Sequence, residues 1–144
     1  MDERLDPANP DALLREDVER FFASYRDAFN SGDPAALAGH VAVPCLLVEW
    51  GITVWSSADE ALQAMTRLLT FYRESGAAEA HFVIEGLLPQ GELGVVANVA
   101  WKIGRSDGRE GWTFRTSYNL RRDKAWRIVC FTTYGDDKAR PSTS

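Results

Sequence analysis

The chain has 144 residues, a formal net charge of −5, 45% hydrophobic residues and 26% charged residues. This length suffices for one domain with its own core, and the composition is typical of a soluble globular protein. The acidic balance argues against a nucleic-acid or anionic-membrane partner, because both need a basic face.

The start of the chain, MDERLDPANPD, is acidic and lacks the apolar stretch of a secretory signal peptide. No apolar run approaches the roughly twenty residues that cross a bilayer. We therefore expect a cytoplasmic protein with a single domain over residues 1–144, in which residues 1–8 and 136–144 are loose tails.

The predicted elements begin with a long amphipathic helix over residues 9–32. Its apolar residues recur every three or four positions, which places them on one face. Asn9 and Pro10 suit the first turn of a helix, and Gly32 suits its end. The face expected to enter the core consists of Leu14, Val18, Phe21, Phe22, Tyr25 and Phe29.

A short helix is predicted over residues 33–41, because Asp33 can cap it and Pro34 suits the first helical position. Pro44 is expected to end this segment and to open a strand at VPCLLVEWG, residues 43–51. A second strand is expected directly afterwards, at ITVWSS.

Ser57 and Glu60 have the spacing of a capping box, which predicts a third helix that ends at Gly76. The helical period again selects one face for the core. That inner face is expected to contain Leu62, Met65, Leu69 and Tyr72.

Four longer strands separated by turn sequences are predicted next, at AHFVIEGLL, ELGVVANVAWKIG, GWTFRTSYNL and WRIVCFTTY. Turns this short join antiparallel neighbours. Helices gathered early and antiparallel strands gathered late indicate an α+β fold, with the helices on one face of a curved sheet.

Alternation along these strands predicts which side chains share a face. One face of the second strand holds Val95, Ala97, Val99, Trp101 and Ile103, and one face of the third holds Trp112, Phe114, Thr116, Tyr118 and Leu120. In the last strand Trp126, Ile128 and Cys130 face one way while Val129 and Phe131 face the other, so alternation does not decide which face points inward. Apolar residues on both sides suggest that a second copy of the protein covers the outer face.

The cysteines and histidines limit which metal sites and reactive groups the sequence can supply. Cys45 and Cys130 lie in separate apolar runs and are expected to be reduced core thiols. His40 and His81 have no partners at metal-ligand spacing, so no metal site is expected. The sequence has no glycine-rich phosphate loop and no G-x-S-x-G motif, and we expect no cofactor.

The runs YRDAFNSGDPAALAGHVAVPCLLVEWG and SYNLRRDKAWRIVCF resemble the NTF2-like superfamily, in particular its SnoaL-like members. The shared pattern of helix, N-x-G-D, short helix, strand and final W-R-I hairpin covers nearly the whole chain. The resemblance implies a cone, in which three N-terminal helices pack on a strongly curved, mostly antiparallel sheet of about six strands around a pocket. It also implies a homodimer paired through the sheet. Members include ketosteroid isomerase, scytalone dehydratase, limonene epoxide hydrolase and polyketide cyclases, and many have no assigned activity.

Laid without a gap on ketosteroid isomerase, Tyr25 falls on the oxyanion-hole tyrosine and Glu49 falls on the general-base carboxylate. The second oxyanion donor of the isomerase, a protonated aspartate, falls at Thr116, or at Ser117 if the hairpin holds an insertion. Here the chain departs from the pattern, because a hydroxyl is a weaker donor than a carboxylic acid. The Asp-Arg-Asp arrangement of the epoxide hydrolase and the His–Asp set of the dehydratase have no match in this chain.

Two interpretations of Glu49 are open. In one, the carboxylate lies at the exposed end of its strand, next to Gly51. In the other, it points into a cavity beside Tyr25, where burial would raise its pKa and make it a proton acceptor. Tyr25 is likewise either a core tyrosine or a catalytic hydrogen-bond donor.

The aromatic residues Trp55, Trp101, Trp112 and Tyr118 are expected to line the pocket, and His81 is a further candidate there. Two functional hypotheses follow. The first is a cofactor-free isomerase, cyclase or hydrolase-like enzyme that transfers a proton on a small, largely apolar molecule, with Glu49, Tyr25 and Thr116 as catalytic residues. The second is a ligand-binding or dimerisation module without chemistry.

Overall fold

The computed structural model describes residues 10–135, and the expectation of loose tails at 1–8 and 136–144 lies outside that range, as does the proposed cap at Asn9. Within it, the elements are α1 (Pro10–Ser31), α2 (Pro34–Ala38), β1 (Val41–Val48), β2 (Ile52–Trp55), α3 (Ala58–Glu74), β3 (Ala77–Pro89), β4 (Gly94–Arg105), β5 (Trp112–Arg122) and β6 (Trp126–Tyr134). The predicted order of helices and strands is confirmed.

The six strands form one sheet in the order β2-β1-β6-β5-β4-β3. The β1–β6 pair is parallel, and the other neighbours are antiparallel. The last four strands are a meander, as their short turns predict, and β1 joins its free edge through β6. The predicted α+β class, with a mostly antiparallel sheet, is confirmed.

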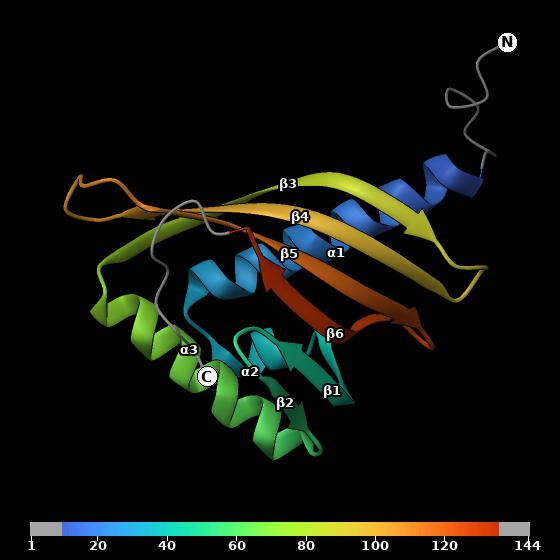
Figure 1. Ribbon diagram of the computed structural model, residues 1–144, viewed down its shortest axis with the longest axis horizontal. Helices are drawn as coiled ribbons and strands as arrows, with labels where there is room; N and C mark the ends of the chain where they lie inside the picture. Colours follow the sequence, from blue (N-terminus) through green and yellow to red (C-terminus); the bar gives the residue numbers. More distant parts are fainter. Residues whose placement is uncertain (1–9, 136–144) are drawn as a thin grey trace, which may run out of the picture.

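The helices and the bent sheet enclose the core between them. Helix α1 packs along β3, and α3 contacts both β3 and the β1–β2 hairpin. Figure 1 shows β1 and β2 turned away from the long strands β3 to β5, with α3 lying beside them. This curvature produces the cone that the NTF2-like resemblance implies.

Local capping positions the helices as predicted. The Asp33 carboxylate accepts hydrogen bonds from the backbone N–H groups of Ala35 and Ala36, and Ser57 Oγ accepts from Glu60 N–H at 3.2 Å. The Glu60 carboxylate reaches the N–H of Ser56 rather than that of Ser57, so the capping box is shifted by one residue. Gly32, with φ 73°, supplies the left-handed conformation that ends α1.

Strand β1 begins at Val41, earlier than the predicted start near Pro44. Val41 pairs with Ile128 of β6, and the register then shifts before Leu46 pairs with Cys130. Pro44 lies within this irregular stretch. A proline has no N–H to give to a ladder, and an interruption in the pairing tolerates it.

Helix α3 differs from its prediction at one position. Leu62 is 37% exposed, while the neighbouring Ala61 is buried together with Met65 and Tyr72. Leu69 is half-buried, as expected of the inner face. The buried face of α3 therefore includes Ala61 in place of the predicted Leu62. The smaller Ala61 side chain permits close packing at the start of the helix.

A bulge resolves the undecided face of β6. Leu120 pairs with Ile128 and Asn119 pairs with Cys130, so Val129 is an extra residue on β6. The extra residue changes the alternation, which allows both Ile128 and Phe131 to be buried. The inner faces predicted for β4 and β5 are confirmed, with Phe114 half-buried and the other residues buried.

Candidate functional site

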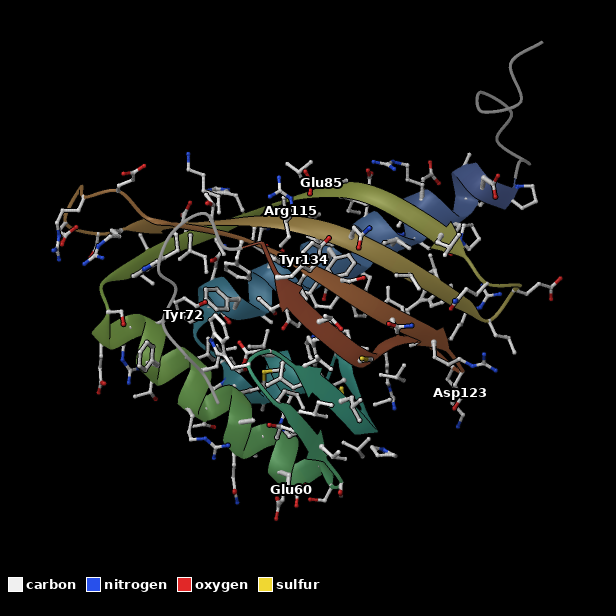
Figure 2. All side chains as sticks on the ribbon, viewed as in Figure 1. Glu60, Tyr72, Glu85, Arg115, Asp123 and Tyr134 are labelled. Atoms are coloured by element: carbon white, nitrogen blue, oxygen red, sulfur yellow. The ribbon has the colours of Figure 1, made fainter. Side chains whose placement is uncertain are left out.

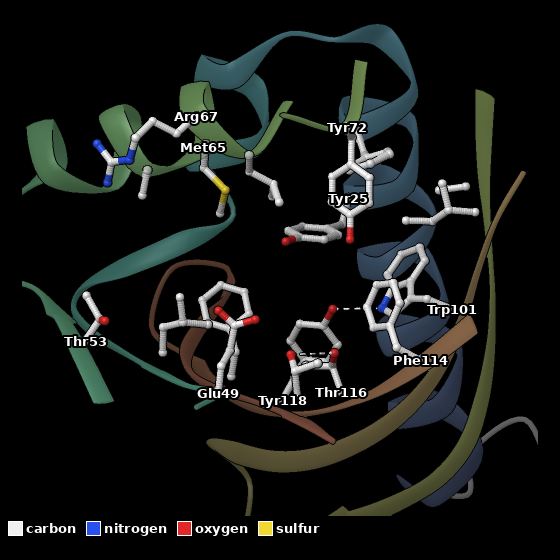
Figure 3. Close-up of a pocket in the computed structure, with 18 of the residues that line it drawn as sticks. Tyr25, Glu49, Thr53, Met65, Arg67, Tyr72, Trp101, Phe114, Thr116 and Tyr118 are labelled. Atoms are coloured by element: carbon white, nitrogen blue, oxygen red, sulfur yellow. Dashed lines mark hydrogen bonds between the residues drawn. The ribbon is translucent and has the colours of Figure 1, made fainter. Parts of the chain in front are cut away.

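A cavity of about 160 Å³ lies inside the cone, between α1, α3 and the concave face of the sheet (Figure 3). Its walls are mostly aromatic and aliphatic. The residues that line it are Tyr25, Phe29, Leu47, Glu49, Thr53, Trp55, Ala64, Met65, Arg67, Leu68, Tyr72, Ala80, Trp101, Ile103, Phe114, Thr116, Tyr118, Phe131 and Thr133.

Tyr25 enters the cavity from the inner stripe of α1. Its side chain is buried against the rings of Phe22, Trp101 and Tyr118, at centroid distances of 6.4, 6.0 and 6.2 Å. Burial, followed by the nearby Tyr118, raises the pKa of Tyr25 well above its ordinary value of 10.0. The phenol therefore keeps its proton at neutral pH, and it can act as a hydrogen-bond donor to a bound molecule.

Glu49 lies just beyond the end of β1, in the tight connection to β2. Its backbone N–H donates to the carbonyl of Gly51 at 3.0 Å, which fixes the turn. The residue is half-buried and lines the cavity, and Figure 3 draws its carboxylate on the same cavity as Tyr25 and Tyr118. Glu49 is thus at the strand end, as one interpretation held, and also on the cavity, as the other held.

Hydroxyl groups line the part of the cavity formed by the sheet. Thr116 is 2% exposed, and its Oγ1 lies 3.2 Å from Oγ1 of Thr133 on the adjacent β6. The indole N–H of Trp101 donates to the hydroxyl of Tyr118 at 2.8 Å. Because an indole nitrogen only donates, the Tyr118 oxygen accepts, and this bond fixes the position of the phenol.

The structure places three of the four predicted aromatic residues on the cavity. Trp55, Trp101 and Tyr118 lie on the cavity. Trp112 shares a face with Tyr118 but sits at the start of β5, where its ring packs on Tyr72 at 5.9 Å and under the guanidinium of Arg105 at 5.0 Å. It is buried, but the structure does not place it among the residues that line the cavity.

The structure also places His81 outside the cavity. It alternates with the inward-facing Ala80 and Phe82 along β3, so its side chain projects from the outer face of the sheet. There it is 66% exposed, with Nε2 lying 3.7 Å from a carboxylate oxygen of Glu79. The outer face also carries the ion pair between Glu85 and Arg115, at 2.8 Å (Figure 2).

Sequence reasoning missed Thr53, Arg67 and Thr133 as cavity residues. The bulge in β6 changes which side chains of the strand point inward, so simple alternation does not place Thr133 on the cavity. Arg67 gives no signal in the sequence, because an exposed arginine on a helix is ordinarily a solvated residue. It lines the cavity at an exposed position, and Figure 3 draws its guanidinium directed away from Tyr25.

The described residues supply no metal-ligand cluster and no reactive thiolate to this site. Among residues 10–135, no three His, Cys, Asp or Glu side chains gather as a metal would require. Burial raises the pKa of the Cys45 thiol to about 12, so this thiol stays protonated. The described helices include none with the length and apolar character to cross a membrane.

Comparison with known proteins places the chain in a family. The family described as "NTF2-like protein (DUF6841)" matches residues 15–136, and the chain belongs to it. Among proteins with curated descriptions, none matches this chain.

Solved structures share the fold. An NTF2-like protein of unknown function from Shewanella oneidensis matches with a TM-score of 0.69 and 18% identity, over 83% of this chain and 98% of its own. A ketosteroid isomerase-like protein from Erwinia carotovora atroseptica matches with a TM-score of 0.65 and 14% identity, over 86% of this chain and 96% of its own. A protein of unknown function from Mycobacterium tuberculosis matches with a TM-score of 0.71 and 12% identity, over 94% and 78% of the two chains. Identities this low support the fold alone.

Proposed function

We propose that this NTF2-like protein binds a small, largely apolar carbonyl compound in its cavity and transfers a proton on it. The proposal rests on one observation above all: Glu49 and Tyr25 line the same mostly apolar cavity, one from the connection between β1 and β2 and one from the first helix. A carboxylate and a neutral phenol on one cavity are the groups that proton transfer beside a carbonyl requires.

The size of the cavity limits the substrate. An apolar cavity of about 150 Å³ holds one benzene ring. The cavity here measures about 160 Å³. A compound with a single ring fills it, whereas a molecule with several fused rings has to extend beyond it. We therefore propose a monocyclic substrate rather than one of steroid size.

In the proposed reaction, the Glu49 carboxylate removes a proton from the carbon next to the carbonyl group. The electron pair of that C–H bond moves toward the carbonyl oxygen, which becomes an enolate oxygen. Tyr25 donates a hydrogen bond to this oxygen, and Thr116 is a second, weaker donor. Protonated Glu49 then returns the proton either to the same carbon or to another carbon of the conjugated enolate. Return to the other carbon moves the double bond and is an isomerisation.

The proposal can be tested without knowing the natural substrate. Cyclohex-3-en-1-one is a monocyclic probe whose isomerisation to the conjugated ketone is followed by ultraviolet absorption, and deuterium exchange into cyclohexanone reports proton removal alone. We expect catalysis above the buffer rate, and a loss of about 10²–10⁴-fold in Glu49→Gln, which is the usual contribution of a general base.

Glu85→Gln is the matched control, because Glu85 lies on the outer face of the sheet and pairs with Arg115. It should leave both rates unchanged. Equal rates for the wild type and Glu49→Gln with both probes would refute the catalytic role of Glu49.

A specific observation favours the alternative, a ligand-binding module without chemistry. In the ungapped comparison with the isomerase, Thr116, or Ser117 with an insertion, falls at the position of the protonated aspartate, and the Thr116 hydroxyl already interacts with Thr133. Under this alternative, native mass spectrometry detects a bound monocyclic compound, while neither isomerisation nor deuterium exchange exceeds the buffer rate.

We also propose that the protein forms a homodimer through the outer face of its sheet. Leu46 and Val54 pair across β1 and β2 and are exposed, and the adjacent Ile52 is exposed as well. Exposed apolar side chains that neighbour one another on a sheet favour an interface with a second sheet. A dimer is compatible with either function of the cavity.

A further inference from the structure

A second concave site lies on the outside of the cone, between the middle of α1, the turn that joins α2 to β1 and the β5–β6 hairpin. This groove has a volume of about 540 Å³, and none of its lining residues lines the inner cavity. It is built from segments far apart in the sequence, namely residues 17–24, 39–40 and 122–127.

The groove is strongly cationic, although the whole chain has a net charge of −5. Four of its lining residues, Arg20, Arg122, Lys124 and Arg127, carry positive charges, and only one carboxylate, that of Asp17, lines it. The Asp17 carboxylate forms an ion pair with the guanidinium of Arg20. Lys124 and Arg127 form no ion pair with the described residues.

Part of this cationic surface is held in place before any ligand arrives. The guanidinium of Arg122 donates to the backbone carbonyl of Glu92 at 2.9 Å and lies 5.3 Å from the ring centre of Trp126. These contacts reduce the side-chain entropy that binding would otherwise cost. Arg122 is thus a fixed donor, flanked by the neighbouring charges of Lys124 and Arg127.

Trp126 forms part of the wall of the groove. Its side chain lines the groove, and its indole N–H is buried with no hydrogen-bond partner among the described residues. A buried donor without an acceptor is uncommon and costs free energy. The donors that line the groove are the guanidinium and ammonium groups of its cationic residues, and these suit a partner rich in acceptors.

We propose that this groove binds a soluble compound with a diphosphate or similarly charged phosphate group. Ionised phosphate oxygens are acceptors only, and guanidinium groups bind them through two parallel hydrogen bonds. A long polyanion such as a nucleic acid fits less well, because the net negative charge outside the groove repels it. The site is separate from the cavity and independent of the reaction proposed there.

The test is calorimetric titration of the full chain with sodium pyrophosphate at low ionic strength. We expect saturable binding of one pyrophosphate per chain. The double variant Lys124→Gln/Arg127→Gln should bind at least about ten-fold more weakly, because it removes two charge-assisted contacts. Arg73→Gln/Lys102→Gln is the matched control, since it makes the same change in net charge at exposed positions outside the groove.

Three results would overturn the proposal. The first is no binding by the wild type, and the second is an equal loss in the two double variants, which would indicate general electrostatics. The third is equal or tighter binding of malonate or of phosphatidic acid vesicles, which would exclude a preference for a soluble phosphate. Circular dichroism and urea midpoints verify that each variant is folded, and catalytic tests on the inner cavity should not distinguish the variants from the wild type.

Discussion

The side-chain amide of Asn30, at the end of α1, forms two hydrogen bonds with the backbone of Ala80 in β3. Ala80 N–H donates to Asn30 Oδ1 at 2.8 Å, and Asn30 Nδ2 donates to the Ala80 carbonyl at 3.2 Å. Ala80 itself lines the cavity. The pair therefore attaches the end of the first helix to a wall of the site, and it accounts for the asparagine of the N-x-G-D pattern.

We predict that Asn30→Ala lowers the free energy of unfolding by about 1–3 kcal/mol, because it leaves backbone groups of Ala80 without partners. Urea denaturation measures this change. Asn98→Ala, on the exposed outer face of β4, is the control and should cost less. Equal stabilities of Asn30→Ala and the wild type would show that the two hydrogen bonds contribute nothing net.

The hydroxyl pair of Thr116 and Thr133 should behave as a unit. Thr116→Val is expected to cost about 1–2 kcal/mol of stability, since it preserves shape but leaves the Thr133 hydroxyl without this contact. The double variant with Thr133→Val should cost less than the sum of the single variants. Additive effects in this double-mutant cycle would mean that the two hydroxyls do not interact.

The buried phenol predicts a dependence of stability on alkaline pH. Because burial raises the pKa of Tyr25 above its ordinary 10.0, the unfolded chain loses this proton at a lower pH than the folded one. The stability from this residue is complete below pH 10 and decreases as the pH rises further, by up to about 1.4 kcal/mol per pH unit.

Urea titrations at successive pH values above 10 test this expectation. In Tyr25→Phe the alkaline loss should be shallower than in the wild type. The control is Tyr134→Phe, at an exposed tyrosine, which should leave the slope unchanged. Parallel pH profiles for Tyr25→Phe and the wild type would contradict the raised pKa.

Cys45 should resist thiol reagents in the folded protein. Its side chain is 1% exposed, so a reagent does not reach it in the folded protein. Burial raises its pKa to about 12, so the reactive thiolate does not form at pH 8. A disulfide reagent is expected to modify Cys45 in a Cys130→Ala variant only at the rate of unfolding. Fast labelling of that variant in native buffer would contradict this prediction.

The proposed homodimer gives the last prediction. Val54→Glu introduces a charge into the exposed apolar surface around Leu46 and Ile52, and it should shift the protein from dimer to monomer. Light scattering at micromolar concentration measures the mass. Leu13→Glu, at an exposed position on α1, should leave the mass unchanged. A monomeric wild type would refute the dimer.

The sequence by itself determined the elements, their order and most of the inward faces. Helix stripes, caps and strand alternation are local properties, because each depends on residues a few positions apart. The inner faces of β4 and β5 followed from alternation alone, and Asp33 caps α2 as its position predicts. The family resemblance likewise depended on these local patterns.

Only the tertiary structure decided which inward residues reach the cavity. Trp112 and Tyr118 share a face, yet Trp112 lies at the start of β5 against Tyr72 and Arg105, while Tyr118 lies on the cavity. Position along a strand relative to α3 depends on packing between distant segments, and alternation carries no information about it. The bulge at Val129 and the groove that joins α1 to the β5–β6 hairpin have the same origin, because pairing and packing across the chain create them.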